Sequence, residues 1–228
     1  MNEFDQYATS YDEALTRGIA VSGEDKTYFA RGRVAWLARC LQQLGERPRH
    51  VLDFGCGTGN ATPLLLDLLH ANAVTGVDTS PGLLDEARRL HGTDRATFVP
   101  AADFNPAGQM DLAFCNGVFH HIPVTERTGV ARSICRSLRP GGLFALWENN
   151  AWHPGARYVM WRIPFDRDAS PLAPPAARCL LQDAGFECLS TTYQFVFPRL
   201  LRALRGWEPS LSRWPFGAQY QVLARRVG

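Results

Sequence analysis

The sequence predicts an α/β fold built on a mostly parallel sheet, and two features of the chain lead to this prediction. From residue 50 onward, short apolar runs alternate with amphipathic stretches of helical periodicity. Strands and helices that alternate in this way form a sheet with both faces covered by helices. The run "VLDFGCGTGNATPLLL" at residues 51–66 also breaks at a glycine-rich turn between its expected strand and helix. In such sheets a ligand binds beyond the carboxyl ends of the strands.

The strands of the expected sheet are short apolar segments bounded by polar or turn-forming residues. In the first two thirds of the chain they cover residues 50–54, 73–78, 96–101, 111–116 and 143–148. Helices are expected from the glycine turn to Leu69, over 81–90 with Pro81 in the first turn, and over 124–139 before the turn "PGG" at 140–142. Most successive strands are therefore separated by a helix, as parallel pairing requires.

The two ends of the chain depart from this alternation. Residues 1–45 have helical character and precede the first strand, so we expect them to fold over the edge of the sheet as a lid. Residues 150–172 carry aromatic residues and prolines with little periodicity, which predicts a second lid-like segment. The rest of the chain is expected to form a helix over 174–187 and strands over 189–197 and 217–226. We therefore expect a single domain over residues 1–228 with two lid-like additions.

The composition is that of an ordinary globular protein and narrows the range of functions. Among 228 residues, hydrophobic residues make up 46% and charged residues 20%, which is not the composition of a disordered chain. The formal net charge of +2 is too small to indicate binding to nucleic acid or to a membrane surface. The start "MNEFDQYATSYDEAL" lacks the apolar core of a signal peptide, and the six cysteines include no C-x-x-C pair. We therefore expect a cytoplasmic protein with free thiols and no metal site.

The glycine turn places Gly55, Gly57 and Gly59 at the junction of strand and helix. Glycine in such a turn lets a ligand approach the backbone and the amides of a helix N-terminus. The dinucleotide fingerprint G-x-G-x-x-G does not fit, because Asn60 stands where its third glycine belongs. The pattern D-x-G-C-G-T-G instead resembles motif I of the class I S-adenosylmethionine (SAM)-dependent methyltransferases. The stretches "NGVFHHI" at 116–122 and "LRPGGLFAL" at 138–146 extend this resemblance.

The resemblance implies a Rossmann-like fold with an antiparallel last strand, SAM as the cofactor, and a set of cofactor contacts. Asp78 ends the second strand, where a carboxylate can accept both ribose hydroxyls, although "DTSP" also suits a helix N-cap. Asp103 and Phe104 stand where the family contacts the adenine, although an Asp beside "NPAG" is also typical of a turn. The cofactor-binding residues implied in this way are Tyr11, Arg33, Gly55, Gly57, Asn60, Asp78, Thr79, Asp103, Phe104 and Asn116.

The N-terminal segment and the C-terminal third are similar to one subgroup, the small-molecule methyltransferases. In that subgroup a tyrosine from a "YD" pair lies near the sulfonium, and a basic residue of the next helix meets the methionine carboxylate. These positions correspond here to Tyr11 and Arg33, with Arg31 competing for the second role. The alternatives are that Tyr11 packs the lid and that Arg33 is a solvated helix charge.

Candidates for the reaction itself follow the fourth and fifth strands. Of the adjacent pair His120 and His121, we expect His121 to face the site as a general base and His120 to be structural. Asn149 is the second candidate for a catalytic role, because polar groups at the end of the fifth strand can orient a substrate, although Glu148, Asn149 and Asn150 could also cap the exit into the lid. The expected substrate-binding residues are Asn150, Tyr158, Trp161 and Tyr193, although aromatic residues in such segments more often belong to the core.

Three functions are compatible with these features. The first is methyl transfer from SAM to a small molecule, in the manner of secondary metabolism, by positioning donor and acceptor. The second follows from resemblance to the azetidine-2-carboxylate synthases, in which SAM is the only substrate and is cyclised with release of methylthioadenosine. The third is SAM binding without turnover. A nucleic-acid methyltransferase is not expected, because the chain has no basic stripe and has "NGVF" where an N/D-P-P-Y/F motif would stand. The sequence makes no prediction of the oligomeric state.

Overall fold

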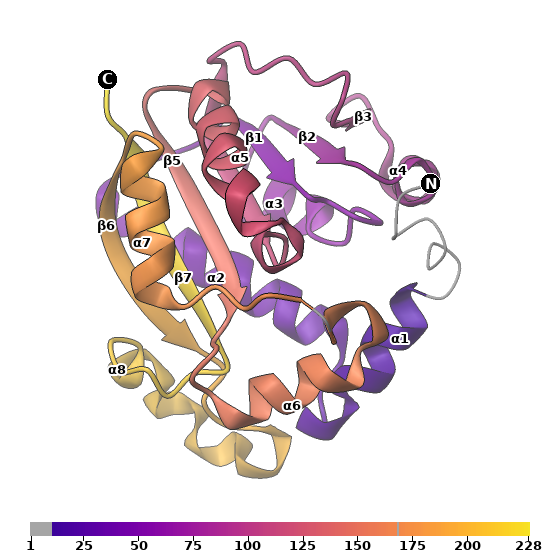
Figure 1. Ribbon diagram of the computed structural model, residues 1–228, viewed down its shortest axis with the longest axis vertical. Helices are drawn as coiled ribbons and strands as arrows, with labels where there is room; N and C mark the ends of the chain where they lie inside the picture. Colours follow the sequence, from indigo (N-terminus) through magenta and orange to yellow (C-terminus); the bar gives the residue numbers. More distant parts are fainter. Residues whose placement is uncertain (1–10, 168) are drawn as a thin grey trace.

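The computed structural model describes residues 11–167 and 169–228, with side chains from residue 13 onward, and contains a twisted seven-stranded sheet between layers of helices (Figure 1). The strands are β1 (His50–Phe54), β2 (Ala73–Asp78), β3 (Ala96–Pro100), β4 (Met110–Asn116), β5 (Leu138–Asn149), β6 (Phe186–Gln194) and β7 (Gln219–Arg226), in the order β3-β2-β1-β4-β5-β7-β6. Strands β1 to β5 pair in parallel, and β7 is antiparallel to both β5 and β6. The predicted Rossmann-like fold with an antiparallel last strand is confirmed.

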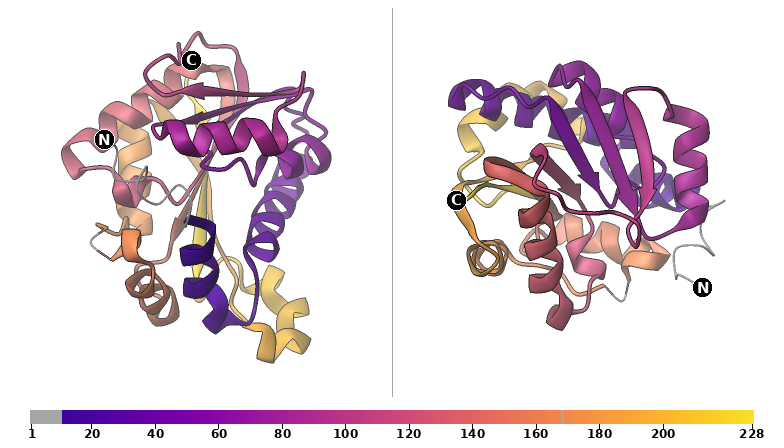
Figure 2. Two further views of the ribbon diagram at one scale, coloured as in Figure 1. Left: turned by 90° about the vertical axis from the view of Figure 1, so that its right-hand side faces the viewer. Right: turned by 90° about the horizontal axis from the view of Figure 1, so that it is seen from above.

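Helices cover both faces of this sheet, as the two views of Figure 2 show. One face packs against α2 (Lys26–Leu44) and α3 (Thr62–Leu68), and the other against α5 (Val124–Ser137) and α7 (Pro174–Asp183). Helix α4 (Pro81–His91) lies beside β2 and β3. The remaining helical segments are α1 (Tyr11–Ile19), η2 (Ala20–Ser22), η3 (Phe119–His121), α6 (Pro154–Arg162), η4 (Pro164–Asp166), η5 (Arg199–Trp207) and α8 (Glu208–Leu211).

The central strands read as continuous apolar runs because their two faces are both buried. In β4, Leu112 and Phe114 pack toward α2 and α3, whereas Ala113 and Cys115 pack toward α5 and α7. All four side chains are at most 2% exposed. A strand of a parallel sheet that is covered on both sides has no position left for a polar alternation. The same burial explains why the first two strands have the bounds that the sequence predicts.

The expectation of a lid over residues 1–45 is only partly correct. Val34, Leu37 and Leu41 of α2 are at most 3% exposed and pack against the sheet residues Val51 and Phe114. This half of α2 is therefore a structural layer of the fold. Helix α1 is the lid-like part, because it packs against α6.

The predicted irregular segment at 150–172 contains a regular helix, α6. His153 caps this helix by accepting a hydrogen bond from the Ala156 amide at 3.0 Å, and Pro154 occupies its first position. Proline is favourable there because its missing N–H would have no partner inside the helix. Pro164 then limits further extension of the helix.

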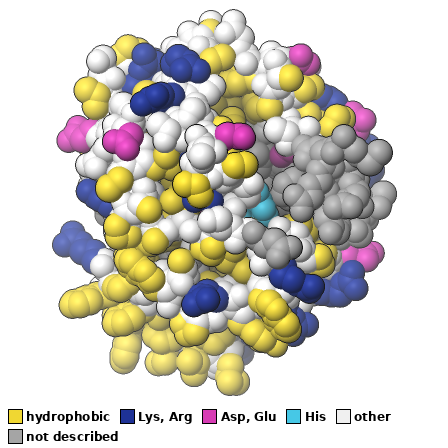
Figure 3. Space-filling model, viewed as in Figure 1, with side chains coloured by type: hydrophobic (Ala, Val, Ile, Leu, Met, Phe, Trp, Pro, Cys, Tyr) yellow, Lys and Arg dark blue, Asp and Glu magenta, His cyan; other side chains and the backbone are white. Residues whose placement is uncertain are grey.

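The helical additions gather beyond the carboxyl end of β5, where α6 and α1 lie side by side (Figure 1). Hydrophobic side chains are concentrated on the surface at this end of the molecule, which is the lower part of Figure 3. Within the described residues, no helix is long and apolar enough to cross a membrane. The strand ends and the additions together enclose the hollows that form the candidate site.

Candidate active site

The glycine turn after β1 forms one wall of the site. Gly55, Gly57 and Gly59 have φ angles of +71°, +54° and +75°, a region that side chains disfavour. A Cβ on Gly55 would lie 2.2 Å from Cγ2 of Val118, so Gly55 is also needed for packing. A Cβ on Gly57 would meet nothing within 4 Å. Gly57 is therefore the position at which the turn leaves its backbone open to a ligand.

This open backbone faces a cleft of about 460 Å³, which we call the glycine-turn cleft. Residues from the ends of β1, β2 and β4 line it, together with the start of α5: Phe54, Gly55, Gly57, Asp78, Thr79, Asn116, Val118, His121 and Glu126 are among them. The cleft thus lies beyond the carboxyl ends of adjacent parallel strands, where this class of sheet binds ligands.

The Asp78 carboxylate fixes the backbone at the base of the cleft. One oxygen accepts a hydrogen bond from the Gly57 amide at 2.8 Å, and the other accepts one from the Ser80 amide at 2.9 Å. Ser80 in turn caps α4 through a 3.3 Å bond from the Leu83 amide. A carboxylate oxygen has further lone pairs, so this arrangement is compatible with both predicted roles, the acceptor of ribose hydroxyls and the organiser of the turn.

Asp53 is a buried acid of motif I that the sequence did not single out as a site residue. Its side chain is only 2% exposed, and its Oδ2 atom has no hydrogen-bond partner in the described part of the chain. Burial and the neighbouring charge of Asp78 raise its pKa to about 7, although Arg33 opposes this. An uncompensated buried oxygen of this kind is costly and is typical of a site that a ligand completes.

Two histidines of η3 belong to a buried ionic network. His120 Nδ1 lies 2.6 Å from a Glu148 oxygen, and His120 Nε2 lies 3.5 Å from Asp166. Burial lowers the pKa of His120, but the charges and hydrogen bonds of Glu148 and Asp166 outweigh this and raise it to about 10. Burial also acts to raise the pKa of Asp166, yet hydrogen bonds from His120 and His121 lower it overall. His120 therefore carries a proton at neutral pH and is buried between two acids, a position compatible with the structural role expected for it.

His121 joins this network to the cleft, because its Nε2 lies 3.1 Å from Asp166 while the residue lines the cleft. The facing atoms of His120, His121 and Asp166 all lie within 4.8 Å of one another, close enough to hold a metal ion. A metal would have to displace the proton that Glu148 and Asp166 stabilise on His120, so an ion-pair network accounts better for this cluster.

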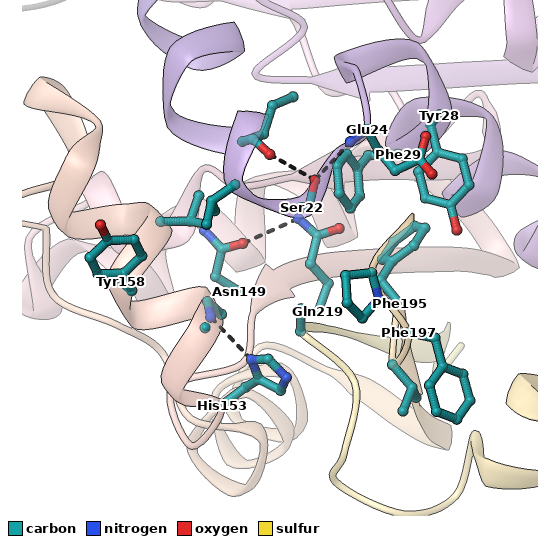
Figure 4. A pocket seen from close by; sticks show the side chains of 18 of the residues that line it. Ser22, Glu24, Tyr28, Phe29, Asn149, His153, Tyr158, Phe195, Phe197 and Gln219 are labelled. Carbon is teal, nitrogen blue, oxygen red and sulfur yellow. Dashed lines mark hydrogen bonds between the residues drawn. The ribbon is translucent and has the colours of Figure 1, made fainter. Parts of the chain in front are cut away.

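A second hollow of about 290 Å³, which we call the aromatic pocket, lies between α1, α2, α6 and the segment after β6 (Figure 4). Tyr28, Phe29 and Phe195 pack around one corner, with ring centroids 4.9 to 5.9 Å apart. The charged Arg205 stacks on Tyr28 at 4.6 Å and pairs with Glu24 at 2.9 Å. The pocket is therefore mainly apolar, and one of its cations is already neutralised.

Phe195 is held in this pocket at a conformational cost. It is a non-glycine residue with φ of +63°, which L side chains rarely adopt. Its ring packs directly on α2 at Gly32, where an added Cβ would approach the ring to 2.6 Å. Such strain persists only where surrounding contacts impose it, and it is concentrated at functional sites.

The polar side of the aromatic pocket adjoins the glycine-turn cleft. Asn116 of the cleft and Asn149 of the pocket are the last residues of the neighbouring strands β4 and β5. Asp53 lies on β1, the other neighbour of β4, and interacts electrostatically with Asp78 of the cleft and Arg33 of the pocket. The two hollows therefore both lie at the carboxyl end of the sheet, on neighbouring strands.

The structure brings many of the predicted residues to these hollows. Gly55, Gly57, Asp78, Thr79, Asn116 and His121 line the cleft, and Arg33, Asn149 and Tyr158 line the aromatic pocket. Tyr11 was also predicted to contact the cofactor, but its side chain lies outside the described residues.

Other predicted cofactor and substrate residues lie elsewhere. Asn60 donates its amide to Thr58 at 2.8 Å, and Asp103 is an exposed residue of the turn after β3. Phe104 packs against the core beneath α5 and α7. Trp161 is 61% exposed and stacks on Tyr158. None of these four lines either described hollow.

Two expected substrate-binding residues are structural. Asn150 is fully buried, and its amide donates to the Pro215 and Gly217 carbonyls while accepting from the Trp152 amide. Tyr193 is 8% exposed and packs in the core beside Tyr220. Asn150 therefore connects the residues after β5 to the segment before β7 by hydrogen bonds, and Tyr193 is a core residue.

Sequence reasoning missed Asp53 as a site residue, and also Gln219, which lines the aromatic pocket. Asp53 could have been found, because an acid within an otherwise apolar strand is unusual unless it has a partner. Gln219 gave no comparable signal, since its neighbours in the pocket are distant in the chain.

Comparisons with known proteins agree with this geometry. Residues 51–142 match the family described as a methyltransferase domain. Trans-aconitate 2-methyltransferase of Acidovorax sp. (strain JS42) is 39% identical over 207 residues, which cover 79% of this chain and 78% of the relative. The enzyme of the same name from Escherichia coli (strain K12 / DH10B) is 30% identical over 161 residues, covering 67% and 63%. The match to that of Methylobacterium nodulans spans only 43% of the relative's length.

Solved structures show the same fold at low sequence identity. Human N-acetylserotonin methyltransferase in complex with SAM has a TM-score of 0.67 and 16% identity, covering 99% of this chain and 59% of that one. An S-adenosylmethionine-dependent methyltransferase from Mesorhizobium loti has a TM-score of 0.59 and 19% identity, covering 82% and 96%. At this identity the likeness establishes the fold alone.

Proposed function

The chain belongs to the class I SAM-dependent methyltransferases, and we propose that it transfers the methyl group of SAM to a small molecule bound in the aromatic pocket. The observation that carries this proposal is that two hollows lie at the ends of neighbouring strands, one with an open glycine backbone and the other with apolar walls. Methyl transfer needs a donor and an acceptor held in line and away from water.

The residues of the glycine-turn cleft fit SAM. The backbone at Gly57 has room for the ligand, and Asp78 offers carboxylate oxygens for ribose hydroxyls. Two residues beside the cleft would hold the methionine portion: the Asp53 Oδ2 atom suits its ammonium group, and the Arg33 guanidinium, which lines the aromatic pocket, suits its carboxylate. SAM would supply an activated methyl group on a sulfonium. The protein then contributes chiefly binding, orientation and exclusion of water.

The walls of the aromatic pocket favour an acceptor with an apolar body. Phe29, Phe195 and Val159 line it, and the Arg205 charge is taken up by Glu24. The relatives named for trans-aconitate act on a molecule with three carboxyl groups. Because the walls of this pocket are mainly apolar and Arg205 is already paired with Glu24, we propose for this chain an acceptor with fewer carboxyl groups, which Lys26 and Arg33 can accompany.

His121 is the proposed general base for acceptors that must lose a proton. It lines the cleft, and Asp166 at 3.1 Å would stabilise the imidazolium that forms. Acceptors that are already nucleophilic would not need this step.

A second candidate function is supported by Asp53. In this alternative SAM is the only substrate: its amine nitrogen forms a bond to the γ-carbon, the carbon–sulfur bond breaks, and its electrons leave with methylthioadenosine. The proton lost by the ammonium would pass to Asp53, whose pKa of about 7 suits it to accept a proton at neutral pH. Azetidine-2-carboxylate would be the second product.

Mass spectrometry with methyl-labelled SAM separates these functions. The protein is incubated with SAM alone, and then with a panel of small acceptors that have an apolar body. Label in an acceptor together with S-adenosylhomocysteine would support methyl transfer. Methylthioadenosine above the blank in the absence of any acceptor would replace it with cyclisation. SAM that binds by calorimetry but is never consumed would indicate a binding protein and overturn both.

A further inference from the structure

Three side chains form a hydrogen-bonded chain along the polar side of the aromatic pocket. Arg33 Nη1 on α2 donates to Gln219 Oε1 on β7 at 2.9 Å. Gln219 Nε2 then donates to Asn149 Oδ1 on β5 at 3.1 Å, as the dashed line in Figure 4 marks. Asn149 and Gln219 are direct partners in the antiparallel pairing of β5 with β7, so the second bond is supported by the sheet itself.

The donor and acceptor of each hydrogen bond in this series follow from Arg33, its first member. A guanidinium has only N–H donors, so it must meet the oxygen of the Gln219 amide. The nitrogen of that amide must then point to Asn149 and meet an oxygen there. Asn149 is therefore fixed with its oxygen toward Gln219 and its nitrogen pointing away from it, as Figure 4 shows.

The Asn149 nitrogen carries two N–H donors and makes no hydrogen bond to another described residue, although Asn149 lines the pocket. The described charged residues that line the pocket are mostly cations: Lys26, Arg33 and Arg205 line it together with one acid, Glu24. A pair of amide donors beside a guanidinium suits a ligand oxygen that carries negative charge or a carbonyl dipole.

We propose that Gln219 is a positioning residue that orients the Asn149 amide, so that Asn149 donates hydrogen bonds to a carboxylate or carbonyl oxygen of a bound ligand. This inference rests on the proposed function in placing SAM and an acceptor in this site. The oxygen belongs either to the methionine portion of SAM or to the acceptor, and the experiment below distinguishes the two.

The test uses Gln219→Glu, which keeps the shape of the side chain and reverses the direction of its hydrogen bond with Asn149. A glutamate still accepts from Arg33, but its second oxygen can only accept. Asn149 must then turn over to donate to it, which leaves the Asn149 oxygen toward the ligand. Thermal unfolding of the variant serves as the control for folding.

Calorimetry with SAM and with decarboxylated SAM identifies the source of the oxygen. If it is the SAM carboxylate, Gln219→Glu weakens SAM binding by about tenfold or more and changes binding of decarboxylated SAM by less than about twofold. If the acceptor supplies it, SAM affinity is unchanged and the KM of a carbonyl or carboxylate acceptor rises by a similar factor. A purely structural role for Gln219 would weaken both forms of SAM equally and would overturn the proposal.

A double-mutant cycle with Asn149→Ala separates reorientation of the amide from the added charge of glutamate. If Gln219 acts through Asn149, the double variant behaves as Asn149→Ala alone. If the effect of Gln219→Glu persists in full when Asn149 is absent, the added charge explains it and the proposal fails. The proposal also fails if Gln219→Glu matches the wild type in its affinity for SAM, its affinity for decarboxylated SAM and its KM for the acceptor. If SAM supplies the oxygen, calorimetry reports the effect without any methyl acceptor, and a failure to find an acceptor would overturn the proposed function alone. If the affinity for SAM is unchanged and no acceptor is found, this inference is overturned as well.

Discussion

The pKa of Asp53 leads to a prediction about stability as well as binding. At neutral pH and above, the folded protein must hold a carboxylate that is 2% exposed and lacks a hydrogen-bond partner at Oδ2 within the described residues. Replacing Asp53 with Asn removes this charge and keeps the size of the side chain. We expect Asp53→Asn to stabilise the protein at pH 8 and to weaken SAM binding at the same time.

The size of the effect follows from the pKa. Burial and the Asp78 charge raise the pKa of Asp53 from 3.8 to about 7, which corresponds to about 4 kcal/mol at roughly 1.36 kcal/mol per pKa unit. The folded protein holds this proton more tightly than the unfolded chain does. The free energy of unfolding of the wild type therefore falls as pH rises from about 4 to 7. The opposing attraction of Arg33 is already part of this pKa. Asn removes the loss, but its amide is still a polar group in a buried position that needs hydrogen-bond partners. We therefore expect a net gain of about 1–3 kcal/mol at pH 8.

Urea denaturation followed by circular dichroism at pH 4.5, 6 and 8 measures this difference. The free energies of unfolding of the wild type and the variant should differ more at pH 8 than at pH 4.5. In thermal unfolding at pH 8, the melting temperature of the variant should be higher by roughly 3–10 °C. Comparing the two proteins at each pH cancels the titration of the other groups. A variant that is destabilised equally at all three pH values would refute the reasoning, because no charge-dependent cost would then exist at Asp53.

Three further predictions concern the cleft and its ionic network. Gly57→Val should abolish SAM binding by calorimetry and lower stability by about 1–2 kcal/mol, because its side chain would fill the cleft from a residue with φ of +54°; normal SAM affinity would show that the opening at Gly57 is not used. Asp78→Ala should weaken SAM binding by at least about tenfold and also destabilise the turn, because the Gly57 and Ser80 amides lose their acceptor; unchanged affinity would exclude the ribose role. His120→Gln should remove a pH-dependent part of the stability: with a pKa of about 10, His120 stabilises the wild type fully below about pH 6.5 and progressively less up to pH 10. Urea titrations of both proteins across that range would show parallel curves if the ion pairs of His120 contributed nothing.

The sequence predicted the parts of the fold that depend on local periodicity. The strands 50–54 and 73–78 have the predicted bounds, because each is an apolar run between turn-forming residues and is buried in the sheet. Helix α6 was missed, since its aromatic residues Tyr158 and Trp161 are largely exposed and give no apolar stripe. The role of α2 was also missed, because its amphipathic pattern does not reveal which surface the apolar face will cover.

The predicted site residues that line the cleft include those whose whole signal lies in one segment. Gly57 and Asp78 are examples, since a glycine turn and the end of the next strand have a fixed relation in this fold. Asn150 was misassigned because its partners, the carbonyls of Pro215 and Gly217, come from a distant segment. Gln219 was missed for the same reason: it bonds Arg33 across 186 positions of the chain. Contacts of this length depend on the complete packing of the lid elements on the sheet.

The two hollows also differ in how they relate to the family. Every residue that lines the glycine-turn cleft falls between Phe54 and Val130, within the matched methyltransferase domain at 51–142. The described residues that line the aromatic pocket all fall outside it, in the ranges 15–33, 149–159 and 195–219. The cleft is built at the ends of rigid parallel strands, whereas the pocket is built mainly from helices and loops added around them. Family membership therefore carries information about SAM, whereas the proposed acceptor site lies in the added segments. This division explains why the cofactor follows from motif I while the matched domain by itself carries no information about the acceptor.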